Sequence, residues 1–511
     1  MKRIDTGNKQ MIRNIMANIF AFVVQLGINL YIAPVIVQKV NSSAYGFMNL
    51  ANDFVSYASV ITSIFNSVAA RFIADAFYQG KHDEANKYFN SLLVTNIVLS
   101  SIFAIIGFLV IPLLDRILHI PDLIVNDVKM TFALIFLSYI VTLLTMVFTT
   151  STFVTNRTDI QGTRNILNNV IRFVSILLIF NFVSVKLYWV AVATLIANVM
   201  VGFLNIKITK ALTPELKINV KNAEWKYVGI LAKSGCWMAI TSISSILMRG
   251  LDLIIVNRLL GSEEMGLLSI ARTMPNNMTS VINMIAPLFT PVFILYYSKN
   301  EWGKLKINVE ESVRYMSALL FVPIIGFIVL SHDFYKIWQP SLTSLELYMV
   351  VFLSTITVIQ AFFNSTTATL AQISVVTNKL KMPVLISLLC GILNVLLAVT
   401  LIKFTPLGIF GIAVSSTVIM ILRYVIFNPI YAAYCLNFPW TSFYKSQIST
   451  WMSIPIILFS MFGINKAISV ISFRGLLLKI LLCGSVGYLE IAFIMFNKEV
   501  KHILKGVLGG K

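Results

Sequence analysis

Long apolar runs, separated by short polar segments, fill almost the whole chain. A helix that crosses a membrane needs about 20 mainly apolar residues. Runs of roughly this length lie near residues 14–37, 45–70, 90–113, 130–152, 164–183, 187–206, 228–256, 265–295, 314–331, 346–373, 383–402, 408–431, 448–464 and 475–496. The pattern predicts an all-α integral membrane protein with about 14 transmembrane helices.

The composition supports this class and excludes others. Of 511 residues, 58% are hydrophobic and 12% are charged, whereas soluble domains have about 45–50% apolar and about 25% charged residues. A soluble enzyme, a disordered chain and a disulfide scaffold are therefore excluded. The four cysteines form no CxxC pair and the four histidines are far apart in the sequence, so we expect no metal site and no cofactor.

The basic residues predict how the chain is oriented in the membrane. If the N-terminus is cytoplasmic, alternation across the predicted helices places most of the 40 lysines and arginines in cytoplasmic loops, as the positive-inside rule requires. Both termini are then cytoplasmic. The net charge of +19 follows from these loops, so we expect no nucleic-acid partner.

The two halves of the sequence resemble each other at an offset of about 220 residues. Val40–Gly46 corresponds to Leu260–Gly266, and Thr155–Arg157 corresponds to Thr377–Lys379. Because each repeat holds an even number of helices, the halves enter the membrane in the same orientation, related by an axis along the membrane normal. The predicted parts are an N-terminal six-helix lobe (1–206), a basic cytoplasmic linker (207–227), a C-terminal six-helix lobe (228–435), and an extra helix pair with a basic cytoplasmic tail (436–511).

Polar residues at helical spacing mark one face on each of four predicted helices. These are Asn14, Asn18, Gln25 and Asn29 in the first; Asn52, Ser56, Ser59, Ser63 and Asn66 in the second; Ser234, Thr241, Ser245, Arg249 and Asp252 in the seventh; and Arg272, Asn276, Thr279 and Asn283 in the eighth. The repeat superposes the first on the seventh and the second on the eighth. Because lipid cannot satisfy polar groups, we expect these faces to line a hydrated central cavity. Packing between helices through small and polar residues is the alternative.

The charges on these faces point to an anionic cargo. Arg249 and Arg272 lie deep within their predicted helices, where a charge is costly unless it has a partner or a function. Asp252 is three residues from Arg249 and could neutralise it. Asp53 points about 100° away from the Asn52 face, so it could pair with a neighbouring helix or face the cavity. Pro34 in the first helix and Pro275 in the eighth permit bends.

The chain resembles the polysaccharide-transporter branch of the MOP superfamily, which comprises Wzx-type flippases for lipid-linked oligosaccharides. The resemblance covers about residues 10–435 and includes the turn at Val40–Gly46, the segment Ala69–Arg71 before a basic loop, and Arg272. It also includes Asn14 and Asn18 at the start of the first helix.

The resemblance implies a MATE-like fold and a flippase rather than an enzyme. Its substrate would be a polyprenyl-pyrophosphate-linked oligosaccharide, moved across the bacterial cytoplasmic membrane by alternating access for cell-surface polysaccharide synthesis. Membrane lipids and polysaccharide assembly enzymes would be its partners.

This function gives each candidate residue a role. Arg249 and Arg272 would hold the pyrophosphate, because guanidinium groups pair with phosphate in a forked geometry. The sugar hydroxyls would meet Gln25, Asn29, Asn52, Ser245, Asn276 and Asn283. Asp252 and Asp53 are candidates for coupling a proton or a sodium ion.

Three other functions are alternatives on the sequence alone. A MATE-like cation-coupled multidrug antiporter predicts a cavity with net negative charge, whereas the polar faces here carry two arginines and one aspartate. The lipid II flippase branch also has fourteen helices, but it usually places a basic–acidic pair in the first helix, where this chain has Gln25 and Asn29. A membrane glycosyltransferase or polymerase is a third alternative, although the outer loops are short and no nucleotide-binding P-loop motif occurs.

Overall fold

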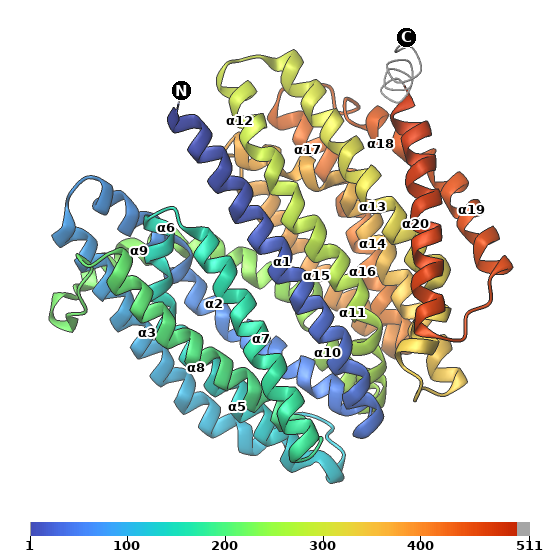
Figure 1. Cartoon of the computed structure of the whole chain (residues 1–511), viewed down its shortest axis with the longest axis horizontal. Helices are drawn as coiled ribbons and strands as arrows, with labels where there is room; N and C mark the ends of the chain where they lie inside the picture. The colour runs from blue at the N-terminus through green and yellow to red at the C-terminus, as the bar shows by residue number, and fades with distance from the viewer. Residues whose placement is uncertain (1, 498–511) are drawn as a thin grey trace. The chain divides into compact units, whose positions relative to one another are not determined.

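The computed structural model describes residues 2–497, and for residues 2–15, 17, 18 and 158 it describes only the backbone. Regular secondary structure in this part of the chain is entirely helical (Figure 1). Within it, 14 helical segments are long and apolar enough to cross a membrane. The predicted all-α membrane fold is confirmed, and the chain is a multi-pass membrane protein.

The chain forms two compact units that divide at Gly266. Helices of the first unit are α1 (Lys2–Lys39), α2 (Ser42–Tyr78), α3 (His82–Val110), α4 (Leu114–Ile117), α5 (Val125–Met146), α6 (Thr150–Val154), α7 (Thr158–Phe182), α8 (Leu187–Leu212), α9 (Trp225–Ser245), the π turn η5 (Ile246–Gly250) and α10 (Asp252–Leu259). Helix α11 (Ser262–Ile285) begins in this unit and continues past its boundary.

The second unit begins at Leu267. After α11, its helices are η6 (Ala286–Phe289), α12 (Thr290–Ser298), α13 (Trp302–Trp338), α14 (Ser344–Val376), α15 (Lys381–Phe404), α16 (Phe410–Leu422), η7 (Arg423–Phe427), α17 (Asn428–Cys435), α18 (Tyr444–Trp451), α19 (Ile454–Ala467) and α20 (Phe473–Met495).

The helix boundaries repeat along the chain at the predicted offset. Helix α2 spans Ser42–Tyr78, and the second copy runs from Ser262 to Ser298. The next helices, α3 and α13, begin at His82 and Trp302. The loops agree as well, because Asn156 and Asn378 both adopt a left-handed backbone, with φ of 54° and 55°. The internal repeat is therefore visible in the backbone as well as in the sequence.

Helix α2 is the centre of the first unit and packs against α3, α5 and α9. Two glycines allow its closest contacts. A Cβ atom at Gly235 of α9 would overlap the carbonyl oxygen of Ile64, and one at Gly266 of α11 would lie 2.5 Å from the carbonyl oxygen of Ser42. The repeat assigns α9 and α10 to its second half, but their packing along α2 places them in the first unit. The repeat and the compact units are thus two different divisions of the chain.

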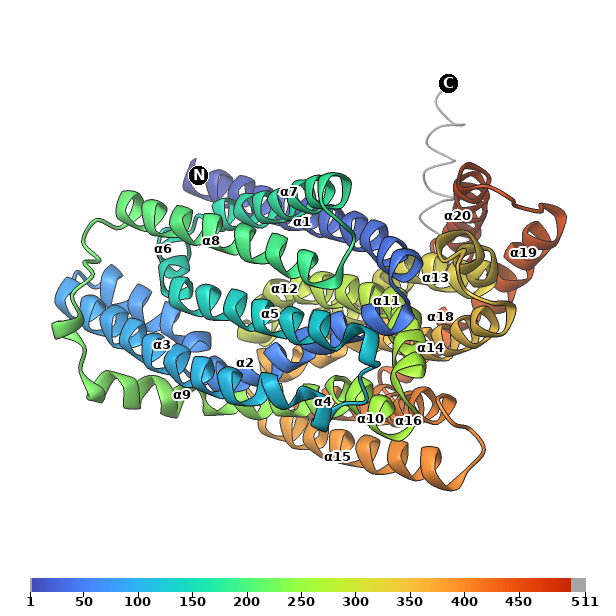
Figure 2. The ribbon, with the colours of Figure 1, turned by 90° about the horizontal axis from the view of Figure 1, so that it is seen from below.

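The second unit is built around α13, which packs against α14, α19 and α20 (Figure 2). The extra helix pair is fastened to it by polar bonds. Lys479 of α20 is only 2% exposed. Its Nζ atom lies 2.7 Å from the Oδ2 atom of Asp333. At the middle of α13, the Leu319 carbonyl accepts a hydrogen bond of 2.9 Å from the Tyr488 hydroxyl of α20. A lysine inside an apolar helix is thus explained by an acid on α13.

Candidate functional site

The contact between α2 and α9 leads to the first part of the candidate site. Because Gly235 lets the two backbones approach, the helices run side by side as far as the end of α9. There the chain forms the π turn η5, and the Tyr57 hydroxyl of α2 donates a hydrogen bond to the Gly250 carbonyl. π turns interrupt the regular bonding of a helix and are frequent at functional sites.

Three charged residues lie at this contact. Arg249 precedes Gly250 in the π turn, and Asp252 begins α10 directly after it. Asp53 lies one helical turn before Tyr57 on α2. The bond between Tyr57 and Gly250 therefore brings the predicted residues Arg249, Asp252 and Asp53 into one region of the first unit. Asp252 is 5% exposed, whereas Arg249 and Asp53 are half-buried.

Uncharged polar groups lie on three helices of the same unit. Asn52 is exposed, and its Nδ2 atom donates to the Met48 carbonyl at 2.9 Å. Ser245 is also exposed, and its hydroxyl donates to the Thr241 carbonyl at 3.0 Å. Each group donates to its own helix while its oxygen keeps the capacity to accept. On α1, Gln25 is exposed and Asn29 is half-buried.

The far part of the polar face on α2 serves helix packing instead. The side-chain amides of Asn66 and Asn96 of α3 form a reciprocal pair, with N–O distances of 2.9 and 3.1 Å. The Thr62 hydroxyl lies 2.8 Å from the Tyr139 hydroxyl of α5. The polar face on α2 therefore has two uses: Asn66 joins helices, while Asn52 and Ser56 remain exposed.

The remaining predicted residues belong to the second unit. Arg272 is half-buried on α11, and Asn276 and Asn283 are exposed farther along the same helix. The Ala271 carbonyl beside Arg272 accepts a hydrogen bond of 3.3 Å from the Tyr335 hydroxyl of α13. The side chains of Asn14 and Asn18 lie outside the described part of the structure.

Sequence reasoning missed two residues that shape the first unit. Tyr57, which holds the π turn, lies one turn after Asp53, and this spacing was the available signal. Asn257 of α10 holds the loop at His119: its Oδ1 accepts from the His119 backbone N–H at 2.9 Å, and its Nδ2 donates to the His119 carbonyl at 3.1 Å. No local pattern predicts that clamp, because its partners are 138 residues apart.

Known proteins share this architecture. The chain is 28% identical over 427 residues to "Uncharacterized membrane protein EpsK" of Bacillus subtilis (strain 168), covering 82% of both chains. It superposes on an inward-facing multidrug resistance MATE family transporter of the MOP superfamily with a TM-score of 0.70 at 10% identity, covering 82% of this chain and 95% of the other. For the lipid II flippase MurJ, in an inward closed conformation, the TM-score is 0.65 at 15% identity, with 96% and 100% covered.

A family match covers more than half of the chain. Residues 9–295 match the family described as "Polysaccharide biosynthesis protein". This match and the likeness to MOP structures confirm the resemblance predicted from the sequence. The chain belongs to the polysaccharide biosynthesis protein family, on the fold of the MOP superfamily.

Proposed function

We propose that this protein is a flippase that moves a polyprenyl-pyrophosphate-linked oligosaccharide across the bacterial cytoplasmic membrane by alternating access. Both termini are cytoplasmic in this proposal, and the protein binds and releases its cargo without chemical change. Membership of a polysaccharide biosynthesis family supports the cargo class, and the similar fold of a lipid II flippase supports the mode of action.

One observation carries the proposal: an arginine lies in a π turn of the same unit that carries exposed amide and hydroxyl groups on α1, α2 and α9. The turn containing Arg249 is held to α2 through the Tyr57 hydroxyl. A fixed guanidinium can form two parallel hydrogen bonds to phosphate oxygens. Asn52 and Ser245 offer the neutral donors and acceptors that sugar hydroxyls require. In this scheme Arg249 holds the pyrophosphate, while Gln25, Asn29, Asn52 and Ser245 meet the sugar.

The second unit supplies a further cation. We assign Arg272 to binding the anionic part of the cargo, and Asn276 and Asn283 on the same helix to binding its sugar. Asp53 and Asp252 are the acids at the Arg249 contact, and we assign them the coupling proton or sodium ion. Polysaccharide assembly enzymes are the proposed partners, since they would consume the translocated product.

A reconstituted leaflet-transfer assay tests the proposal. Full-length protein in vesicles is given a fluorescent polyprenyl-pyrophosphate-linked sugar, and its transfer between leaflets is followed. Arg249→Ala should slow transfer at least about tenfold, because it removes a charge-assisted bidentate contact. The matched control is Arg258→Ala, which removes an exposed arginine from the far end of α10 and should change the rate less than about twofold.

Two results would contradict the proposal. One is an Arg249→Ala protein that inserts normally and transports at the rate of Arg258→Ala. The other is unaltered protein that transfers no lipid-linked sugar while it converts the sugar chemically, which would favour a glycosyltransferase or polymerase.

A cation antiporter is the second candidate, because two acids, Asp53 and Asp252, lie at the Arg249 contact. An antiporter would expel a cationic dye from the same vesicles against an ion gradient. Loss of dye transport in Asp252→Asn, with intact transport in Arg249→Ala, would support that function.

A further inference from the structure

The segment that joins α8 to α9 is held in place along α3 by two asparagines. The Asn86 amide donates to the Glu215 carbonyl and accepts from the Lys217 N–H, both at 2.8 Å. One turn later, the Asn90 amide donates to the Lys217 carbonyl at 2.9 Å and accepts from the Asn219 N–H at 2.8 Å. Each side-chain amide thus makes the pair of hydrogen bonds that a peptide group of a neighbouring strand makes in a sheet. The backbone is extended at Asn219, and the short 3-10 helix η4 (Val220–Asn222) follows it.

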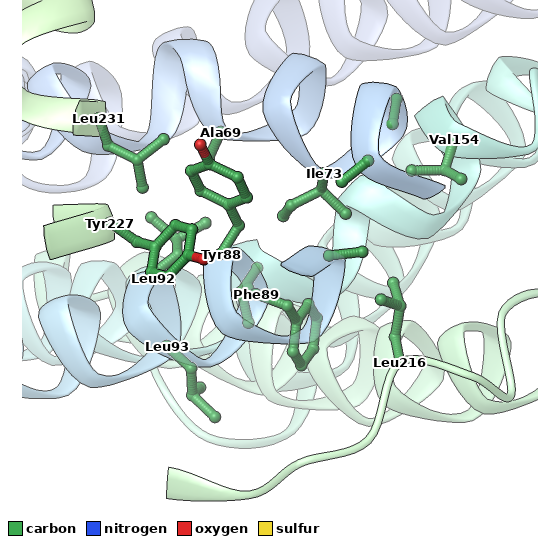
Figure 3. Packing of buried hydrophobic residues seen from close by; sticks show 14 of the residues in the cluster. Ala69, Ile73, Tyr88, Phe89, Leu92, Leu93, Val154, Leu216, Tyr227 and Leu231 are labelled. Atoms are coloured by element: carbon green, nitrogen blue, oxygen red, sulfur yellow. The ribbon is translucent and has the colours of Figure 1, made fainter. Parts of the chain in front are cut away.

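The end of the segment is fixed by a second set of contacts. The Ser91 hydroxyl accepts from the Glu224 N–H at 3.0 Å and donates to the Glu224 carbonyl at 3.2 Å. The Glu224 carboxylate lies 2.7 Å from the Lys87 ammonium. Leu216 and Tyr227 are both buried in the apolar cluster between α2 and α3 (Figure 3). The backbone between them is therefore a fixed part of the first unit. Of the expected linker at 207–227, residues 207–212 belong to α8, and the contacts with α3 begin at Glu215.

The exposed side chains of this segment include large apolar and basic ones, along with the neutral Asn219 and Asn222. Ile218 is 51% exposed, Val220 is 54% exposed and Trp225 is 77% exposed. Lys217, Lys221 and Lys226 are exposed beside them. The nearby acid Glu224 is already paired with Lys87, so the exposed face has a net positive charge. Large apolar side chains that a fixed backbone keeps exposed indicate a surface that contacts lipid or another molecule.

The position of the segment indicates what covers it. Leu187–Leu212 and Trp225–Gly250 are both candidate membrane spans, so the segment between them lies where two membrane helices end. Tryptophan is enriched at this boundary, where its ring sits among the headgroups. Lysines at the same level attract anionic lipids.

We propose that the exposed face of residues 217–226 is a binding site for anionic phospholipid headgroups. Trp225, Ile218 and Val220 insert between the lipids, and Lys217, Lys221 and Lys226 bind the phosphates. Because α3 holds the backbone rigidly, the face anchors the first unit at the membrane surface. This site is independent of the cargo and of the proposed flippase activity.

Fluorescence quenching by brominated lipids tests the site. Full-length protein is reconstituted in phosphatidylcholine vesicles containing equal fractions of brominated phosphatidylglycerol or brominated phosphatidylcholine. The chain has 7 tryptophans, so the Trp225 signal is the difference between unaltered protein and Trp225→Phe. We expect brominated phosphatidylglycerol to quench this signal at least about twofold more than brominated phosphatidylcholine, because the lysines concentrate anionic lipid.

Two triple variants identify the cause of the preference. Lys217→Gln, Lys221→Gln and Lys226→Gln together should remove the preference for phosphatidylglycerol while quenching by phosphatidylcholine persists. The matched control removes the exposed lysines Lys186, Lys336 and Lys403 and should retain the preference. A Trp225 signal that neither lipid quenches would overturn the site and indicate that a protein covers this face. Equal quenching by the two lipids in unaltered protein would also overturn it.

Discussion

Helices α1 and α9–η5–α10 occupy the same position in the two repeats but differ in backbone and charge. Helix α1 continues through Pro34 to Lys39. Its counterpart is interrupted by the π turn at Ile246–Gly250, and the interruption falls where Arg249 replaces Asn29. Helix α1 is thus uninterrupted although it contains Pro34. Its counterpart is interrupted at Ile246–Gly250, where there is no proline. The π turn is held by a contact with the neighbouring helix, whereas the difference in charge lies in the sequence itself.

Those contacts hold the turn that contains Arg249, the residue to which the proposed function assigns the anion. Gly235 allows α9 to pack closely against α2, and the Tyr57 hydroxyl donates a hydrogen bond to the Gly250 carbonyl at the end of the π turn. Arg249 is thereby placed beside Asp252 on a fixed backbone. The same position in α1 carries a neutral amide. The two copies therefore share a fold, while the charge and the irregular backbone are confined to one of them.

Preventing the close packing of α9 on α2 should reduce the stability of the protein more than any other change considered below. In Gly235→Ala the new methyl group would overlap the Ile64 carbonyl, which cannot move without the backbone. We expect a loss of about 3 kcal/mol or more in the free energy of unfolding. Gly229→Ala on the same helix has no atom within 4 Å of the new methyl group and should be neutral or slightly stabilising. Thermal unfolding in detergent compares the two, and equal melting temperatures would contradict the assigned contact.

A smaller effect is expected from the bond that holds the π turn. Tyr57→Phe removes the donor to the Gly250 carbonyl, which should cost about 0.5–1.5 kcal/mol of stability. The turn would then hold Arg249 less firmly, so leaflet transfer should also fall several-fold. Tyr31→Phe on α1, where the ring packs edge-on against Phe173 at 5.5 Å, is the matched control and should leave transfer unchanged. If both variants transport alike, the bond to Gly250 does not support the site.

The smallest effect is expected on α1 itself. Asn29→Ala removes a half-buried amide at the position that matches Arg249. Because this removes a neutral contact to a sugar hydroxyl, transfer should slow only about two- to fivefold, corresponding to a single uncharged hydrogen bond. The same leaflet-transfer assay measures it. A loss as large as that of Arg249→Ala would show that the two copies contribute equally.

Much of the architecture could be predicted from the sequence because the bilayer sets the length of each apolar run. The fourteen spans and the repeat follow from this constraint and from motifs such as Thr155–Arg157. The faces containing Asn52 and Arg249 could be found from helical spacing. Spacing alone could not separate Asn52, which is exposed, from Asn66, whose partner Asn96 lies on another helix.

Other features depend on tertiary contacts that local patterns do not encode. The π turn at Ile246–Gly250 has no distinctive residues, and it is held by Tyr57, 193 residues away. The basic linker was predicted from its charge, but its docking depends on Asn86 and Asn90, about 130 residues earlier. The division of the compact units at Gly266 likewise follows from the packing of α9 on α2 and not from the repeat.

Binding of the anion by Arg249 is tested by the affinity of the purified protein for a polyprenyl pyrophosphate, measured by titration in nanodiscs. If the arginine in the π turn binds the anion, Arg249→Ala should raise the Kd at least about tenfold, or about 1.4 kcal/mol, while Arg258→Ala leaves it within about twofold. An unchanged Kd in a correctly folded Arg249→Ala protein would contradict the claim.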